Sequence, residues 1–265
     1  MQTVDDVYAL KGWFEPERPG PMLYAHASAT GIGCCRVDRW PRPRIVLVEL
    51  PGGNYALRGD PAALDPADLA DVAGLVEAPP GWLPALRRVD PGTGTWPRIV
   101  STQSATVPPP DASTAGDSVA PPGTGTRPGP PPAVRRLGPD DVGGLEALDP
   151  EDVWIHETWG GAQRLAESGM AWATFAGGCP VAVAAAFYVG ATYEDIGVVT
   201  DRQHRNRGHA TACASSLVAD IRARGRRPSW TTSPGNAGSL AVAARLGFVR
   251  QRDDVLYAVR VPVPD

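Results

Sequence analysis

Hydrophobic positions in the first third of the chain fall into short blocks separated by turn residues. Residues 44–50 (RIVLVEL) favour a strand, because β-branched side chains pack well on a pleated surface. Pro51-Gly52-Gly53 indicates a turn, after which residues 54–58 return as a second strand. Asp65 and Pro66 have the residue types of a helix N-cap and first turn, so we expect a helix there. Its apolar stripe would consist of Leu69, Val72, Ala73 and Val76.

The pattern after residue 132 combines strands with longer helical segments. We expect strands at residues 134–137, 170–175, 180–188, 192–200, 226–232 and 255–261. We expect helices at residues 139–148, 149–159, 162–168, 210–224 and 237–246. This order predicts an α+β fold with a mixed sheet flanked by helices, preceded by a smaller α/β N-terminal module.

Composition changes abruptly between these two patterned regions. Residues 101–132 are dominated by Pro, Gly, Ser, Thr and Ala, with proline runs at 108–110, 121–122 and 130–132. Such a segment cannot bury enough apolar surface to fold alone, which favours an extended spacer. The sequence therefore predicts an N-terminal module over residues 1–100, a linker over 101–132 and a C-terminal domain over 133–265.

Composition also limits the classes of partner. The chain has 265 residues, 43% of them hydrophobic, and a net charge of −4; its arginines dominate no long face, so we expect no nucleic-acid binding. No segment approaches the roughly 18 apolar residues of a membrane span, and the acidic first residues do not resemble a signal peptide. The four cysteines lack metal-site spacing, so we expect free thiols and no metal. We expect a cytoplasmic monomer or homodimer.

The most informative stretch is the strand at residues 192–200 together with the basic turn that follows it. The turn, residues 201–210, reads DRQHRNRGHA, and a helix is predicted to begin at its end. A helix start presents unpaired N–H groups and a partial positive charge. Gly208 lacks a side chain that would block close approach, so a phosphate can lie against the backbone. The stretch has neither the Gly-Lys pattern of nucleotide hydrolases nor a Gly-x-Gly-x-x-Gly run.

Two ordered motifs resemble the GNAT superfamily of acyl-CoA-dependent N-acyltransferases. Arg205-x-x-Gly208-x-Ala210 resembles its pyrophosphate turn. Asn236-x-x-Ser239 followed by Leu246-Gly247-Phe248 resembles its downstream signature. The resemblance covers about half the chain, from residue 134 onward, and implies the GNAT fold there. With Trp230 and its extra N-terminal module, the chain is similar to the subgroup that contains antibiotic self-resistance acetyltransferases of the zwittermicin-resistance type.

The resemblance implies acetyl-CoA as cosubstrate and suggests which residues bind it. In the superfamily the strand splays at the positions of Val198, Val199 and Thr200, which frees backbone groups for the acyl and pantetheine portion. The N–H of Val198 or a neighbour would polarise the thioester carbonyl. The pyrophosphate contacts would come from Arg205, Asn206, Arg207, Gly208, His209 and Ala210. Asn236 would contact the pantetheine arm, and Ser239 would lie near the phosphates.

Glu194 is the candidate catalytic residue. It lies eleven residues before Arg205, where several family members carry a general base that takes a proton from the attacking ammonium. Its strand parity predicts that it faces the same side as Ile196 and Val198, whereas Asp195 would point to the other face. The alternative is a solvated carboxylate or the partner of an arginine.

The general acid is less well defined. The family's usual tyrosine corresponds to Ala243 and is missing here, so either another group or water must protonate the leaving thiolate, and the possible substitutes are Tyr188, Tyr193 and Tyr257.

The sequence thus predicts an N-acetyltransferase that transfers acetyl from acetyl-CoA to an amine of a small molecule, directly in a ternary complex. The alternatives are a non-catalytic acyl-CoA-binding or regulatory module, and a protein-modifying acetyltransferase. We expect the acceptor pocket to involve residues 154–159, the Glu194 strand and the first module. Core or interface anchoring is the expected role of Trp40, Trp82 and Trp96, with pocket lining as the alternative. His26 is expected to be structural or exposed.

Overall fold

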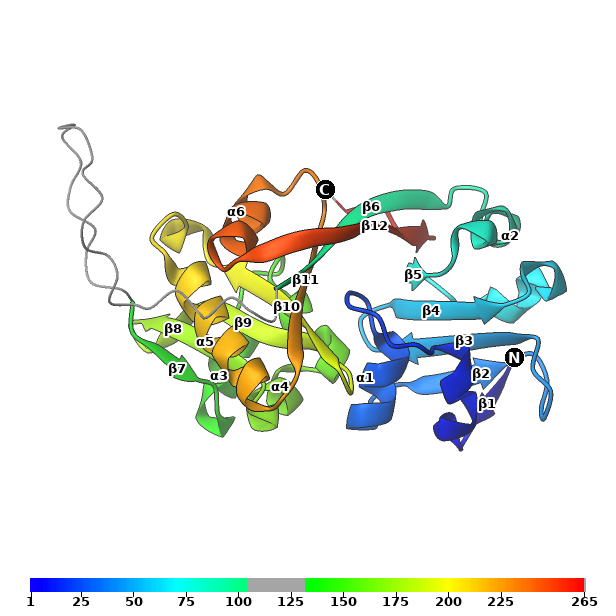
Figure 1. Ribbon diagram of the computed structural model, residues 1–265, viewed down its shortest axis with the longest axis horizontal. Helices are drawn as coiled ribbons and strands as arrows, with labels where there is room; N and C mark the ends of the chain where they lie inside the picture. Colours follow the sequence, from blue (N-terminus) through cyan, green and yellow to red (C-terminus); the bar gives the residue numbers. More distant parts are fainter. Residues whose placement is uncertain (104–131, 265) are drawn as a thin grey trace.

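The chain folds around one long mixed β-sheet (Figure 1). The computed structural model describes residues 1–103 and 132–264. Within them, twelve strands lie in the order β1-β2-β3-β4-β5-β12-β6-β11-β10-β9-β8-β7.

The strands are β1 Gln2–Val4, β2 Cys34–Val37, β3 Ile45–Leu50, β4 Asn54–Gly59, β5 Gly74–Glu77, β6 Gly94–Gln103, β7 Val134–Arg136, β8 Ala171–Ala176, β9 Cys179–Val189, β10 Tyr193–Thr200, β11 Arg227–Thr232 and β12 Phe248–Val259. The α-helices are α1 Leu23–Thr30, α2 Leu83–Val89, α3 Val142–Glu146, α4 Ala162–Ser168, α5 His209–Ala223 and α6 Ala237–Arg245. The 3-10 helices are η1 Val7–Trp13, η2 Pro61–Ala63, η3 Pro66–Leu69, η4 Pro80–Trp82, η5 Pro139–Asp141, η6 Val153–Trp159 and η7 Arg202–His204.

The two ends of the sheet repeat one strand plan. In the N-terminal half, β1 to β4 pair antiparallel in succession, and β4 then pairs parallel with β5. In the C-terminal half, β7 to β10 do the same, and β10 pairs parallel with β11. The connections differ, because the long helix α5 joins β10 to β11 whereas only η2 and η3 join β4 to β5. The N-terminal module thus repeats the strands of the C-terminal half without a counterpart of α5 in that connection.

The two halves exchange their last strands at the centre of the sheet. β6 lies between β11 and β12, and β12 lies between β5 and β6, with antiparallel pairing throughout. Residues 101–103, predicted to begin the linker, are therefore strand: Ser101 pairs with Trp230 on one side and with Arg250 on the other. The backbone hydrogen bonds available from two neighbouring strands override the polar composition here. The remainder of the predicted linker up to residue 131 lies outside the described residues.

One predicted helix is wrong, and two other elements differ from the prediction in helix type or in their first residue. The predicted helix after Asp65 is only the short η3, whose first turn Asp65 caps through Ala67 N–H. The chain then enters β5, which pairs with β4 and β12. Gly74, its first residue, lies so close to Gly53 that a Cβ there would be 2.0 Å from the Gly53 oxygen. The segment predicted as a helix at 149–159 contains the 3-10 helix η6, and β12 begins earlier than expected, at Phe248. The other expected strands and helices of the C-terminal half are confirmed within a few residues, although the segment 139–148 is split into η5 and α3.

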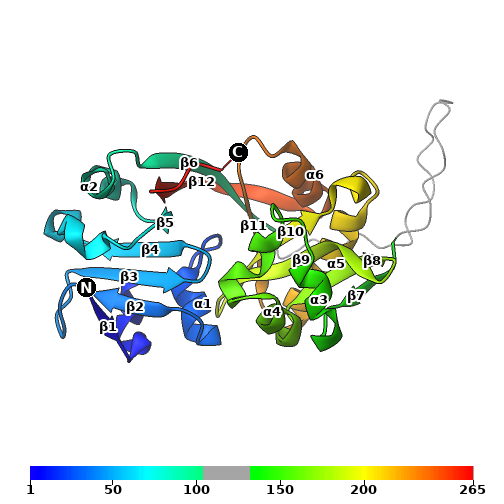
Figure 2. The ribbon, with the colours of Figure 1, turned by 180° about the vertical axis from the view of Figure 1, so that it is seen from behind.

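Helices cover both faces of the C-terminal half (Figures 1 and 2). Alternate residues of β9 pack on opposite sides: Ala182 and Ala184 join the cluster under α5, whereas Val183 and Ala185 join the cluster with α4 and η6. This alternation follows from the two-residue period of a strand. It also decides which side chains of the neighbouring β10 are covered by α5.

Polar contacts attach the N-terminal half to β9 and β10. His26 on α1 is fully buried; its Nε2 lies 3.0 Å from the Thr158 carbonyl and its Nδ1 accepts from Val189 N–H at 3.1 Å. Burial lowers the pKa of His26 to about 4, so the ring is neutral and Nε2 donates to Thr158. Glu17 accepts three hydrogen bonds of 2.8 Å from the N–H groups of residues 191–193. The expected structural role of His26 is confirmed.

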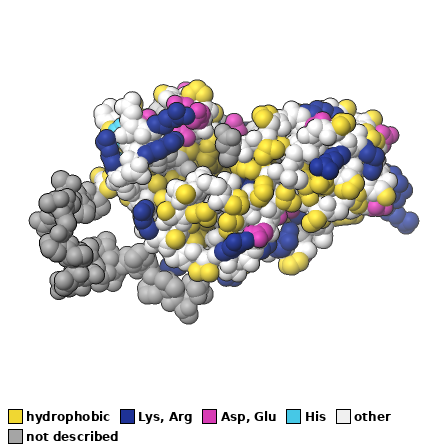
Figure 3. Space-filling model, turned by 90° about the horizontal axis from the view of Figure 1, so that it is seen from above, with side chains coloured by type: hydrophobic (Ala, Val, Ile, Leu, Met, Phe, Trp, Pro, Cys, Tyr) yellow, Lys and Arg dark blue, Asp and Glu magenta, His cyan; other side chains and the backbone are white. Residues whose placement is uncertain are grey.

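The outer surface shows no continuous basic face in the view from above, where arginines alternate with acidic and apolar side chains (Figure 3). Among the described residues, no helix has both the length and the apolar character needed to cross a bilayer.

Candidate active site

The basic turn after β10 forms an open helix start. Gly208 is the N-cap residue of α5, with φ +84°, and no side chain caps the helix. A Cβ built on Gly208 would meet nothing within 4 Å, so the space in front of the backbone is free. The first N–H groups of α5 have no intrahelical partner, and they carry the positive end of the helix dipole. This arrangement suits a phosphate group.

β10 separates from β11 just before this turn. The two strands pair only from Tyr193–Arg227 to Ile196–Trp230, whereas β10 stays paired with β9 as far as Thr200. The edge of β10 from residue 197 to residue 200 therefore faces a gap in the ladder. This is the splay predicted at Val198, Val199 and Thr200.

A cavity of about 450 Å³ occupies this gap and the front of α5, and we call it the turn cavity. Ten of the eleven residues predicted to bind the cofactor line it: Val198, Val199, Thr200, Arg205, Asn206, Gly208, His209, Ala210, Asn236 and Ser239. Arg207 is exposed and does not line it.

The second sequence motif forms the opposite wall of the turn cavity. Asn236 caps α6 by accepting from Ser239 N–H at 2.9 Å. Trp230 on β11 donates from Nε1 to the Ser239 hydroxyl at 2.9 Å, which fixes the indole at the mouth of the splay. The two motifs, separated in sequence, thus meet across one cavity.

A second cavity of about 470 Å³ adjoins the first, and we call it the central cavity. Five residues line both: Trp154, Val198, Trp230, Asn236 and Ser239. Residues of both halves line the central cavity, among them Asn54 and Leu75 from the N-terminal module.

Asp195 is the buried carboxylate of the central cavity. Its Oδ1 accepts from Ser229 Oγ at 2.6 Å and from Thr231 Oγ1 at 3.0 Å. Its Oδ2 has no hydrogen-bond partner among the described residues and is not completely shielded from solvent. Because Asp195 lines the central cavity, we infer that this oxygen faces it. Burial raises the pKa of Asp195 to about 6, against the lowering effect of these hydroxyls and of Arg98 and Arg252.

Two other polar side chains with raised pKa values line the central cavity. Tyr188, its cross-strand partner on β9, donates to Asn54 Oδ1 at 3.1 Å, and burial raises the pKa of Tyr188. Glu157 on η6 also lines the cavity, and burial raises its pKa as well.

Glu194 points away from both cavities. Its parity with Ile196 and Val198 holds, but that face of β10 is covered by α5. Glu194 is fully buried and forms ion pairs with Arg224 at 2.6 Å and Arg226 at 3.0 Å. Glu194 therefore lines neither the turn cavity nor the central cavity, and its carboxylate is held by two arginines, as in the alternative expected from the sequence. The neighbouring Asp195, on the other face, is the carboxylate of β10 that lines the central cavity.

The candidate tyrosines are widely separated. Tyr188 lines the central cavity, whereas Tyr193 accepts from Arg227 and Tyr257 is buried in the N-terminal core; neither lines the turn or the central cavity. Ala243, at the position of the family tyrosine, is buried in the cluster beneath α5 and α6.

The three tryptophans of the first module also differ in location. Trp96 lines the central cavity, Trp82 is buried in the core, and Trp40 is 46% exposed.

Arg98 on β6 is a cavity residue that the sequence did not reveal. It lies in β6, whose sequence GTWPRIVSTQ contains no recognisable motif. Only the insertion of β6 beside β11 brings it to the central cavity.

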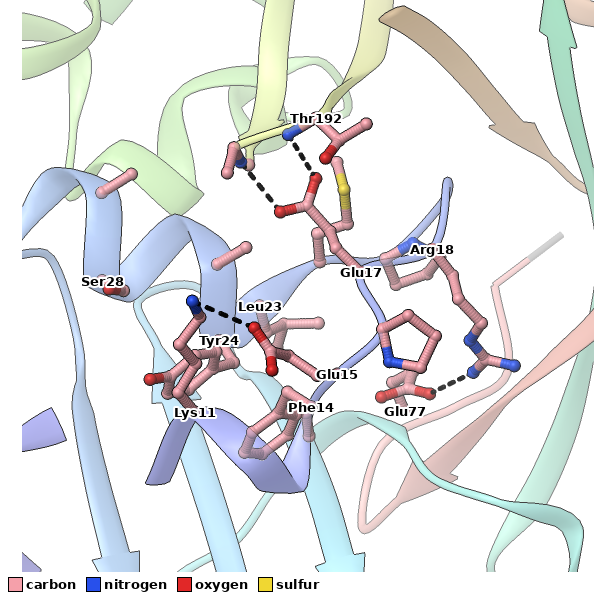
Figure 4. A pocket seen from close by; sticks show the side chains of 18 of the residues that line it. Lys11, Phe14, Glu15, Glu17, Arg18, Leu23, Tyr24, Ser28, Glu77 and Thr192 are labelled. Atoms are coloured by element: carbon pink, nitrogen blue, oxygen red, sulfur yellow. Dashed lines mark hydrogen bonds and ion pairs between the residues drawn. The ribbon is translucent and has the colours of Figure 1, made fainter. Parts of the chain in front are cut away.

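A third cavity, of about 890 Å³, lies in the N-terminal half, and we call it the N-terminal cavity (Figure 4). Its charged groups are largely paired within the protein. Lys11 pairs with Glu15 at 3.0 Å, and Glu77 contacts Arg18 at 4.0 Å and Arg58 at 2.7 Å. Within residues 1–103 and 132–264, no group of three His, Cys, Asp or Glu side chains is arranged to hold a metal ion.

Comparison with known proteins identifies the family. Residues 147–257 match the GNAT acetyltransferase family. An uncharacterized N-acetyltransferase of Streptomyces virginiae, in the mutA 5′ region, is 37% identical over 215 residues, which cover 80% of this chain and 84% of the relative. The chain belongs to the GNAT acetyltransferase family. The uncharacterized N-acetyltransferase YdfB of Bacillus subtilis (strain 168) is 24% identical over 124 residues, or 47% of each chain.

Solved GNAT structures share the fold across both halves. A GCN5-related N-acetyltransferase-like protein from Streptococcus suis gives a TM-score of 0.69 at 15% identity, covering 95% of this chain and 97% of that one. A tandem GNAT protein from the clavulanic acid biosynthesis pathway gives 0.52 at 14% identity, covering 98% and 94%. At these identities the likeness shows the fold alone, and it agrees with the repeated strand plan. The predicted GNAT fold and acyltransferase class are confirmed.

The turn cavity of this GNAT acetyltransferase fits the acetyl-CoA that the family uses. The uncapped start of α5 offers N–H donors to a diphosphate. Arg205 and Arg245 line the cavity, and neither forms an ion pair with a carboxylate among the described residues, so both guanidinium groups can meet phosphates. The free edge of β10 offers backbone groups to an amide-containing arm.

Proposed function

We propose that the protein transfers the acetyl group of acetyl-CoA directly to the amine of a small molecule. The observation that carries this proposal is the shared wall between the turn cavity and the central cavity, beside which Asp195 lies. A donor in the first cavity and an amine in the second would meet at Val198. Holding two reactants in this way supplies on the order of 7–11 kcal/mol toward the barrier.

On the donor side, the residues of the turn cavity bind and orient. Acetyl-CoA supplies the activated thioester when it is bound. The N–H groups at Gly208 to Ala210 hold the diphosphate, and the open edge of β10 at residues 197–200 pairs with the pantetheine arm. A β10 N–H at or beside Val198 donates to the carbonyl oxygen as negative charge develops there.

On the acceptor side, Asp195 takes the proton of the attacking ammonium. A pKa of about 6 leaves the carboxylate ionised at neutral pH and close to the value at which a general base is most effective. Its free Oδ2 faces the cavity, while Ser229 and Thr231 hold Oδ1 in place. The leaving thiolate takes its proton from solvent. Alanine replaces the family tyrosine at position 243, and no tyrosine among the described residues lines the turn cavity.

The central cavity favours a small molecule over a protein as acceptor. Its volume of about 470 Å³ is within the usual range for small ligands, and side chains of both halves enclose it. The resemblance to self-resistance acetyltransferases adds amine-bearing antibiotics to the acceptors worth testing.

The test combines purified protein, acetyl-CoA and a panel of small primary amines with a peptide library. Release of free CoA thiol is followed with a thiol reagent, and N-acetyl products are identified by mass spectrometry. We expect stoichiometric thiol and N-acetyl amine from the small-amine panel. Acetylation confined to peptides would refute the small-molecule acceptor, and thiol release without any N-acetyl product would refute transfer.

A further inference from the structure

Arg98 is a guanidinium inside the central cavity without a carboxylate partner. Its guanidinium lies over the Trp96 ring, with Cζ 3.8 Å from the ring centroid, and Nη2 donates to the Thr231 carbonyl at 3.2 Å. No carboxylate oxygen of the described residues lies within the 4.0 Å limit of an ion pair. Burial lowers the pKa of Arg98 to about 10, and the group is still charged at neutral pH.

The arginines of the N-terminal cavity, in contrast, form ion pairs with carboxylates. In the N-terminal cavity, Arg58 and Arg18 share Glu77, and Arg252 contacts Asp254 at 2.8 Å. Asp195 acts on the Arg98 charge only from beyond ion-pair distance. A buried charge without a direct ion pair is costly, and a ligand carboxylate would offset that cost. Nη1 of Arg98 has no hydrogen-bond partner among the described residues and is not fully enclosed, so a donor remains for a ligand in the cavity.

Thr231 places Arg98 next to Asp195 without joining them. Its hydroxyl donates to Asp195 Oδ1 at 3.0 Å, while its carbonyl accepts from Arg98 Nη2 at 3.2 Å. One cavity therefore presents a carboxylate and a guanidinium that both form hydrogen bonds with the same residue, Thr231. Aromatic side chains complete its wall, including Trp154 and Phe187, whose rings are 5.4 Å apart.

We propose that the acetyl acceptor is a compact amino acid whose carboxylate binds Arg98 while its amine lies beside Asp195. The inference rests on the proposed function, because Asp195 is taken as the base. A carboxylate suits a single guanidinium, which can donate two parallel hydrogen bonds to it. The aromatic wall suits an apolar side chain on that amino acid.

The test uses three matched series of acceptors: apolar amino acids, their carboxamides and the corresponding decarboxylated amines, such as phenylalanine, phenylalaninamide and phenethylamine. For the wild-type protein we expect kcat/KM for the acid to exceed that for the amide and the amine by about 10- to 100-fold, mainly through KM, as for a charge-assisted hydrogen bond. Arg98→Met should abolish this preference. Arg98→Lys should restore part of it, because lysine keeps the charge without the two-pronged geometry.

Two controls keep the outcomes distinct. Arg88→Met removes an exposed arginine of α2 that lines none of the three cavities, and it should leave the preference intact. CoA affinity of Arg98→Met, measured by titration calorimetry, shows whether the variant is folded.

Calorimetric titration of the acids and amides into the CoA-bound protein separates this inference from the proposed function. Carboxylate-dependent binding without acetyl transfer would support the Arg98 site and overturn the proposed reaction. Equal turnover of acids, amides and amines by the wild-type protein would overturn the inference and leave the reaction standing.

Discussion

Replacing Asp195 with asparagine separates the proposed catalytic role of this carboxylate from its cost to stability. Asparagine keeps an oxygen that accepts from Ser229 and Thr231, so the hydrogen bonds of Oδ1 survive. The pKa of Asp195 is raised from 3.8 to about 6, so the folded state binds more protons than the unfolded state between these values. Stability therefore falls as pH rises through this window, and the penalty is complete above about pH 6.

The size of the effect follows from the shift. At 1.36 kcal/mol per pKa unit, burying the ionised carboxylate costs about 3 kcal/mol near pH 8 and about half of that near pH 5. Asp195→Asn should be more stable than the wild type by these amounts. At the same time, kcat/KM should fall by about 10²- to 10⁴-fold, the usual contribution of a general base.

Urea unfolding at the two pH values, followed by tryptophan fluorescence, measures the first effect, and thiol release with a reactive amine measures the second. The wild-type kcat/KM should decline as pH falls through about 6, the pKa of Asp195. Asp253→Asn, which removes an exposed carboxylate on β12, should change neither quantity. An Asp195→Asn protein that is fully active, or that is less stable than the wild type near pH 8, would refute the reasoning.

Three further variants test the surroundings of the site. Gly208→Trp should abolish CoA binding in titration calorimetry with the fold retained. The control Gly225→Trp lies at the other end of α5, with a similar positive φ and equally open space, and should bind CoA normally. Equal CoA affinities of the two variants would contradict the turn assignment. Glu194→Gln should lower the free energy of unfolding by about 2 kcal/mol, less than for a fully buried pair because its two arginines keep solvent contact, while the pH dependence of the rate keeps its shape. A rate loss in Glu194→Gln that high pH restores would instead make Glu194 the base. Glu17→Gln should lower the melting temperature by weakening the charge-assisted bonds to the β9–β10 turn, with Glu15→Gln, on the surface, as the neutral control.

The donor side of the site was largely predictable because it depends on local sequence. A helix start after a strand needs Gly208 for its backbone conformation, and Asn236 caps the next helix through Ser239 three residues later. Both features depend on a few consecutive residues, so the strand, the turn and the helices could be predicted without any tertiary contact. The helix predicted after Asp65 failed for the opposite reason, since pairing with β4 and β12 drew Leu75 and Val76 into a strand.

The sequence by itself indicated the family through its resemblance in two short motifs, the α+β class through its periodicity, and the open helix start at Gly208, because each depends on residues close together in the chain. Only the tertiary structure decided which side chains line the central cavity. The covering of one face of β10 by α5 turns Glu194 into an ion-pair partner and leaves Asp195 at the cavity. The exchange of β6 and β12 between the halves brings Arg98 beside Thr231, which lies more than a hundred residues away in the chain. Such long-range pairing depends on the free energy of the whole sheet, so it cannot be predicted from a local sequence pattern.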